Sequence, residues 1–211
     1  MRRSVDQGIL RGGMSRRSFL SGTGAAAAAT AALESAFTSI AQAAGDAAGP
    51  EVVGPDATPL ALRVNGVTQA VAVEPRATLA EVLRGPLGLT GTKIGCDRGA
   101  CSACTVLIDG APVASCSILA IDVGDRAITT IEGLARDGAL HPVQEAFITH
   151  DALQCGYCTP GLALTCAALL ERVPHPSEAD VKAAISGHLC RCGAYQHVVE
   201  AVLAAAAAGR G

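Results

Sequence analysis

The sequence predicts an α+β protein with a small mixed sheet over residues 60–132, followed by a helical bundle over residues 133–211. Two turn pairs, Asn65 with Gly66 and Asp109 with Gly110, separate strand-like runs in the first half. Beyond Gly133 the apolar pattern changes to that of amphipathic helices. Each half also holds its own set of four cysteines, so we expect two domains with one site each.

The first 43 residues are predicted to be a twin-arginine export signal. Arg16 and Arg17 precede an uncharged alanine-rich stretch, and Ala41 and Ala43 frame a small-x-small cleavage site. The stretch is shorter than the ~20 apolar residues that span a bilayer, so no transmembrane segment is expected. The alternative is an alanine-rich helix that follows two arginines by chance. We therefore expect export to the periplasm.

The composition beyond the signal excludes a nucleic-acid partner. Residues 44–211 carry 11 basic and 17 acidic residues, a net charge of −6, and the whole chain has three Phe, two Tyr and no Trp. Nucleic-acid surfaces need basic patches and aromatic stacking platforms. All nine cysteines follow the signal. Twin-arginine substrates cross the membrane folded, so these thiols can be ligated before they meet an oxidising compartment.

The sheet half begins after a Gly-, Ala- and Pro-rich linker at residues 44–59. Thr78 and Glu81 form a capping-box pattern that starts a short helix between the two hairpins. The expected strands cover residues 60–64, 67–73, 104–109, 112–118 and 126–131.

The helical half is predicted from four amphipathic or apolar runs joined by short loops. Thr159 is the expected N-cap and Pro160 the first residue of one helix, while Ser177 caps the next helix and Gly187 ends it. The four expected helices cover residues 142–153, 161–173, 177–186 and 197–208.

The first cysteine set is predicted to hold a 2Fe-2S cluster. Its spacing, C-x4-C-x2-C followed by a later cysteine, is that of plant-type ferredoxins. Glycines in GCDRGAC allow the backbone to turn its amides toward the sulfurs, and the last cysteine is expected on the return strand of the second hairpin. The members are Cys96, Cys101, Cys104 and Cys116.

The second cysteine set is predicted to lie at helix ends. Cys155 and Cys158 come just before a helix N-terminus, where free amides favour an anionic cluster. Cys190 and Cys192 follow a helix C-terminus, where a C-x-C pair directs both thiols the same way only in an irregular turn. This set is expected to hold a second cluster.

Other interpretations of the cysteines stay open at this point. Zinc also accepts four thiolates, although its sites usually show two C-x2-C pairs, and exported proteins often form disulfides. Cys166 lies in an apolar helix and is expected to pack in the core. His188 is a further but weaker candidate ligand.

Four segments resemble the iron-sulfur subunit of the molybdenum hydroxylases, the xanthine dehydrogenase and aldehyde oxidoreductase family. They are GCDRGACSACTVLIDG, ITTIEGL, LHPVQEAFITHDALQCGYCTPG and SGHLCRCGAYQHVVEAV, and the resemblance covers about residues 60–205. It implies a β-grasp plant-type ferredoxin domain followed by a four-helix-bundle domain, with one 2Fe-2S cluster in each. With the export signal, the chain looks most like the small subunit of the periplasmic aldehyde oxidoreductases.

The resemblance also implies partners and a direction of electron flow. Molybdopterin is expected in a large subunit and FAD in another, with electrons passing through the two clusters between them. In such proteins the helical-domain cluster lies nearest the molybdopterin, which places Gln154 and Cys192 of this chain at the pterin end. Substrate chemistry is expected in the molybdenum subunit. An isoquinoline-type or xanthine-type hydroxylase and a free-standing exported ferredoxin-like carrier are the alternatives.

Two residues depart from the family pattern. Ser102 stands where glycine is usual, and His188 where asparagine is common. A serine at that point is expected either to strain the loop or to donate a hydrogen bond to a sulfur. The cations expected to favour reduced clusters are Lys93, Arg98 and Arg191.

Overall fold

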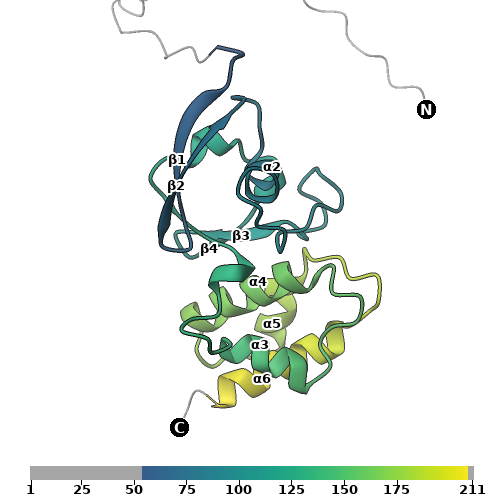
Figure 1. Cartoon of the computed structure of the whole chain (residues 1–211). Coiled ribbons are helices and arrows are strands. Elements are labelled where there is room, and N and C mark those ends of the chain that lie inside the picture. The colour runs from purple at the N-terminus through teal and green to yellow at the C-terminus, as the bar shows by residue number, and fades with distance from the viewer. Residues whose placement is uncertain (1–53, 209–211) are drawn as a thin grey trace, which may run out of the picture. The chain divides into compact units, whose positions relative to one another are not determined.

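The computed structural model describes residues 54–208 (Figure 1). The expected export signal at residues 1–43, most of the linker and the last three residues lie outside this range. Strand β1, Thr58–Val64, begins before the expected end of the linker, so Thr58 and Pro59 belong to the sheet.

The sheet contains two hairpins joined through a short fifth strand. The strands are β1, β2 (Val67–Val73), β3 (Thr105–Ile108), β4 (Ala111–Ala114) and β5 (Ala127–Thr129), in the order β2-β1-β5-β3-β4. β1 and β5 run parallel, and the other pairs are antiparallel.

Both predicted hairpin turns are confirmed. Asn65 and Gly66 have φ angles of 52° and 81°, and Asp109 and Gly110 have 49° and 78°. Two consecutive residues with positive φ are what a type I′ turn requires, which explains the choice of Asn, Asp and Gly.

Helix α2, Leu79–Arg84, covers one face of the sheet (Figure 1). Its capping box is confirmed, because the Thr78 side chain accepts from the Glu81 N–H and the Glu81 carboxylate accepts from the Thr78 N–H. Leu79 and Leu83 are fully buried among sheet residues. This packing forms the core of the first half.

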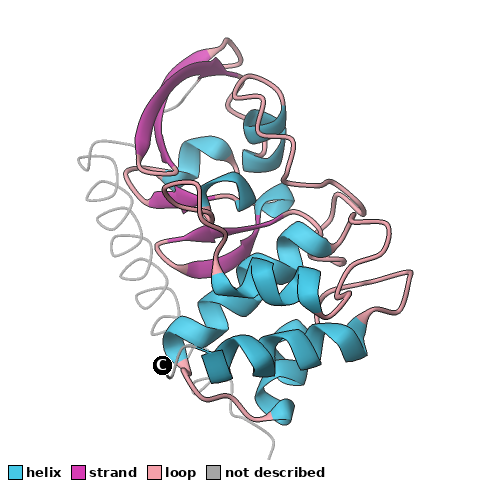
Figure 2. Ribbon diagram, turned by 60° about the horizontal axis from the view of Figure 1, so that its bottom comes forward, coloured by secondary structure: helices cyan, strands magenta, loops and turns pink. Residues whose placement is uncertain are grey.

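The second half holds helices α3 (Pro142–Thr149), α4 (Thr159–Arg172), α5 (Glu178–Ile185) and α6 (Tyr195–Ala208). The α+β prediction is therefore confirmed, and Figure 2 shows the strands and these helices in separate groups. α4 packs on both α3 and α5, and α6 packs on α3 and α5.

Some helix ends differ from the expected positions. Thr159 was expected to cap α4, but the N-cap is Cys158, and Thr159 already lies in the helix. α3 ends at Thr149 rather than continuing to residue 153, and α6 begins two residues before residue 197. The Ser177 cap on α5 is confirmed.

The middle of β3 joins the two halves. Val106 and Ile108 belong to the core between sheet and α2, whereas Leu107 points to the other face and belongs to the helical core. α4 packs directly against β3. Burial on both faces explains why this strand ends in an unbroken apolar run, VLI.

Candidate metal centres

The loop before β3 directs backbone amides at the first cysteine set. The N–H of Ala100 donates to Cys96 Sγ at 3.2 Å, that of Gly99 to Cys116 Sγ at 3.2 Å, and that of Cys96 to Cys101 Sγ at 3.4 Å. Such donors favour thiolates. In agreement, hydrogen bonding from the backbone of Arg98 lowers the pKa of Cys96 to about 7.

The sequence predicts Cys116 on the return strand of the second hairpin. In the structure Cys116 lies beyond the end of that strand. β4 ends at Ala114, and Cys116 lies in a single 3-10 turn, Ser115–Ser117. Ser115 explains the position, because its Oγ donates to the carbonyl of Cys104 at 2.6 Å. The turn brings Cys116 beside Cys104, whose pKa is raised to about 11, chiefly by burial.

The second cysteine set gathers at the N-termini of α4 and α6. Cys158 caps α4, and Cys190 and Cys192 lie in the irregular segment between α5 and α6, as predicted. The Cys158 thiol meets that of Cys190, and the Cys155 thiol meets that of Cys192. Burial raises the pKa of Cys158 to about 12.

The pKa of Cys190 is lowered despite the burial that acts in the opposite direction. The backbone N–H groups of Ala194, Cys192 and Gly193, together with the Cys158 thiol, outweigh this burial. A turn that directs amides at one sulfur is suited to hold a thiolate.

Tyr195 holds this segment in place, a role that the sequence did not reveal. Its hydroxyl donates to the His188 carbonyl at 2.9 Å and accepts from the Cys190 N–H at 2.7 Å. The hydroxyl thus joins the first residue of α6 to the cysteine segment. No local pattern marks a helical tyrosine for this task, although Tyr195 falls within the family-like motif.

The arrangement of the thiols fits binuclear clusters. Over residues 54–208 no three His, Cys, Asp or Glu side chains stand close enough to hold a single ion. Instead, each set forms two hydrogen-bonded thiol pairs. The pairs are Cys96 with Cys101, Cys104 with Cys116, Cys158 with Cys190, and Cys155 with Cys192. A 2Fe-2S cluster takes four cysteine thiolates, two on each iron.

The remaining candidate residues lie around these centres. Gln154 and Arg191 are exposed, Arg98 Nε donates to the Cys96 carbonyl, and Lys93 Nζ donates to the Thr90 carbonyl.

Cys166 and His188 are buried in the helical half. Cys166 is fully buried within α4, which confirms the expectation that it packs in the core. His188 is 5% exposed, and its Nε2 lies 2.8 Å from Thr165 Oγ1. Burial lowers the pKa of His188 to about 4. The contact with Thr165 engages Nε2, whereas the buried Nδ1 has no hydrogen-bond partner among the described residues. His188 belongs to no group of three or more potential metal ligands in residues 54–208.

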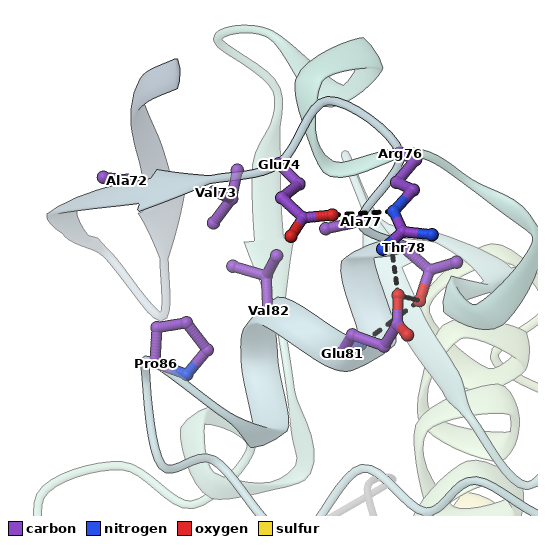
Figure 3. A pocket seen from close by; sticks show the side chains of 9 residues that line it. All are labelled: Ala72, Val73, Glu74, Arg76, Ala77, Thr78, Glu81, Val82 and Pro86. Carbon is purple, nitrogen blue, oxygen red and sulfur yellow. Dashed lines mark hydrogen bonds and ion pairs between the residues drawn. The ribbon is translucent and has the colours of Figure 1, made fainter. Parts of the chain in front are cut away.

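A hollow of about 600 Å³ lies between the end of β2 and α2 (Figure 3). Its wall includes Glu74, Arg76 and Glu81, and its nine lining residues include no cysteine. The Arg76 to Glu74 ion pair and the Thr78 to Glu81 capping box already engage its charged groups. We assign this hollow no role in the metal chemistry.

Two consecutive parts of the chain match known protein families. Residues 62–129 match the family model of the 2Fe-2S iron-sulfur cluster binding domain, and residues 130–203 match that of the 2Fe-2S binding domain. The protein is therefore one with two consecutive 2Fe-2S-binding domains.

The relatives narrow this class to one family. The chain is 51% identical over 148 residues to the nicotine 6-hydroxylase small subunit of Paenarthrobacter nicotinovorans, covering 70% of this chain and 89% of that one. It is 42% identical over 163 residues to the aldehyde oxidoreductase iron-sulfur-binding subunit PaoA of Escherichia coli K12, covering 70% and 71%. The crystal structure of quinoline 2-oxidoreductase from Pseudomonas putida 86 aligns with a TM-score of 0.70 at 43% identity, covering 74% and 97%.

The chain belongs to the family of iron-sulfur subunits of the molybdenum hydroxylases, which confirms the resemblance found in the sequence. It is an electron-transfer subunit of an oxidoreductase complex. Among the described residues, no helix has the length and apolarity needed to cross a bilayer.

Proposed function

We propose that this chain serves a molybdenum-dependent aldehyde oxidoreductase, carrying electrons from a molybdopterin-binding large subunit to a subunit that binds FAD. The observation that carries the proposal is the pairing of eight thiols in two separate sets on loops that touch each other. When bound, each 2Fe-2S cluster accepts and gives up one electron at a time.

The eight cysteines named above are the predicted ligands, four to each cluster. Backbone amides of the first loop and of the segment before α6 point at these sulfurs and would stabilise their negative charge. The chain itself supplies ligation, orientation and burial, and we assign none of its residues to substrate chemistry.

The second set is the one we place toward the molybdopterin. Cys155, Cys192 and Gln154 are exposed, whereas Cys104 and Cys116 of the first set are buried. The resemblance implies that the helical-domain cluster lies nearest the molybdopterin, and an exposed end would allow that contact with another subunit. In this arrangement Gln154 and Cys192 would contact the pterin, and the first set would face FAD.

Two substrate classes compete, because any discriminating pocket would belong to the molybdenum subunit. PaoA supports an aldehyde, while the higher identity to the nicotine 6-hydroxylase small subunit favours a nitrogen heterocycle as the second candidate. Assay of the purified complex with an aromatic aldehyde and with nicotine, using one artificial electron acceptor, separates the two. Turnover of nicotine alone would reject the aldehyde proposal.

Metal analysis is the direct test of the electron-transfer role. Anaerobically purified protein should contain about four irons and four acid-labile sulfides per chain, and dithionite should produce two electron paramagnetic resonance (EPR) signals. Zinc without sulfide would contradict the cluster assignment. A lone monomer retaining all its iron, with no partner in copurification, would instead support the free-standing carrier.

We also propose export by the twin-arginine pathway. The support is Arg16 and Arg17 ahead of an uncharged stretch and a small-x-small site. Replacing both with lysine should leave the iron-loaded protein in the cytoplasmic fraction. Periplasmic recovery of that variant at the wild-type level would contradict the proposal.

A further inference from the structure

Ser102 connects the two cysteine-bearing segments of the chain. It lies between Cys101 and Cys104 of the first set, and its Oγ donates to the carbonyl of Gly187 at 3.0 Å. Gly187 begins the segment that carries Cys190 and Cys192. The two partners are 85 residues apart in the sequence, so this hydrogen bond joins the two halves and not two neighbours.

A backbone hydrogen bond lies next to this contact. The N–H of Leu189 donates to the carbonyl of Cys101 at 3.1 Å. Cys101, a predicted ligand of the first cluster, is therefore bonded directly to Leu189, the residue before Cys190, which is a predicted ligand of the second cluster. Any movement of one segment against the other would break both.

The backbone of Ser102 is in the left-handed region, with φ at 57°. Non-glycine residues occupy this region at a cost, and such residues persist where the surrounding structure holds them. The Ser102 carbonyl accepts from Thr105 Oγ1 at 2.8 Å, which fixes the turn locally. The same residue thus combines a strained backbone with the hydrogen bond to Gly187.

The first turn of helix α4 packs against the Ser102 turn. A Cβ placed on Gly161 would lie 2.5 Å from the Ser102 carbonyl oxygen and 3.3 Å from the His188 ring. The absence of a side chain at Gly161 therefore allows the first turn of α4, the Ser102 turn and the segment before Cys190 to meet. Ser102 lies where these three segments contact one another.

We propose that Ser102 is a positioning residue: its hydroxyl holds the two cysteine-bearing segments in one fixed register, and thereby fixes the mutual orientation of the two clusters. The inference rests on the two clusters of the proposed function. It differs from the sequence expectation that a serine here would donate to a sulfur, because the hydroxyl donates across to the second segment instead.

A pair of substitutions separates the hydroxyl from the backbone strain. S102A removes the hydroxyl and keeps a Cβ in the left-handed region, whereas S102G removes both the hydroxyl and the strain. The matched control is S186A, because Ser186 is one residue from Gly187 and its Oγ donates only locally, to the Ala183 carbonyl at 2.9 Å. All three are made in the full chain and purified with its partners.

Two readouts report the register. The first is the magnetic interaction between the two dithionite-reduced clusters at low temperature, which depends on their distance and orientation. The second is hydrogen exchange at the Leu189 amide, whose protection comes from the bond to Cys101. Both S102A and S102G should keep full iron, lose the wild-type splitting pattern and exchange Leu189 faster, while S186A should match wild type.

The unfolding temperature separates the effect of the backbone strain from the effect of the hydroxyl. S102A should unfold at a lower temperature than S102G, yet both should change the splitting in the same way. Wild-type splitting and Leu189 exchange in S102G or in S102A would overturn the proposal, since the clusters would then keep their geometry without the hydroxyl. Failure of the proposed function would look different, because iron and sulfide would be missing from the wild type.

Discussion

At the scale of single residues, the environment of each thiol separates ligands from packing residues. Cys101 Sγ accepts the N–H of Cys96 and meets a second thiol. Cys166 is fully buried among apolar side chains, and desolvation raises its pKa to about 12. A buried thiol without donors resists ionisation, so it is a poor ligand.

Replacing Cys101 with alanine should therefore remove the first cluster alone. We expect iron per chain to fall by about half and one of the two EPR signals to disappear. Cys166→Ala is the matched control, and it should keep all iron because only a small buried group is lost. Loss of both signals in a folded Cys101 variant would argue against two independent sites.

Tyr195→Phe should weaken the second site through its supporting segment. The variant loses the hydrogen bonds to the His188 carbonyl and from the Cys190 N–H, and about 1 to 3 kcal/mol of unfolding free energy is expected to be lost. The second EPR signal should shift or broaden while the first keeps its shape. Tyr157→Phe, which loses only a bond to the Ile94 carbonyl in the sheet half, is the control. Equal effects of both variants on the second signal would contradict this assignment.

The sequence predicted the features that depend on local spacing better than the contacts between residues distant in the chain. The cysteine sets could be recognised because ligand spacing is local, and the two turn pairs because positive φ selects Asn, Asp and Gly. Ser102 meets Gly187 across 85 residues, and nothing near either residue predicts that contact.

At the scale of elements, the N-terminus of α4 brings the two halves together. Gly161 lies in its first turn, and alanine normally stabilises a helix interior relative to glycine by roughly 0.5 to 1 kcal/mol. Here the added Cβ would approach the backbone oxygen of Ser102 to 2.5 Å, which is too close without a shift of one segment.

Gly161→Ala should therefore destabilise the protein despite its better helix propensity. The measurement is the unfolding free energy from denaturant titration, with the magnetic interaction of the clusters as a second readout. Gly187→Ala is the control, because its Cβ would meet Ser102 Oγ at an ordinary 3.5 Å. A stabilised Gly161 variant with unchanged cluster interaction would show that the contact is not needed.

Helix starts show where local rules succeed and where they fail. Thr78 with Glu81 follows the known capping-box pattern and was predicted, whereas the box of His141 with Gln144 was missed because histidine is not a usual cap. The sequence predicts Thr159 as a cap because this threonine precedes a proline, but the helix starts one residue earlier, after Cys158. The position of Cys158 at the N-cap of α4 thus depends more on the cysteine site to which it belongs than on which residue types prefer the N-cap.

At the scale of the whole described molecule, two apolar cores share one strand. Val106 and Ile108 pack with α2, while Leu107 between them packs with the helices and is 5% exposed. The family models divide the chain near residue 129, yet this strand of the first domain contributes to the core of the second. We expect the two domains to unfold cooperatively for this reason.

Leu107→Ala tests this coupling directly. Truncating a buried leucine costs about 2 to 5 kcal/mol, and here the loss falls on the surface that joins the cores, so unfolding should separate into two transitions. Leu83→Ala is the control, since Leu83 is fully buried in the sheet core alone and should lower stability while keeping a single transition. Circular dichroism follows the helices, and visible absorbance follows the clusters. If the two probes still change together in Leu107→Ala, β3 is not what makes the two domains unfold as one.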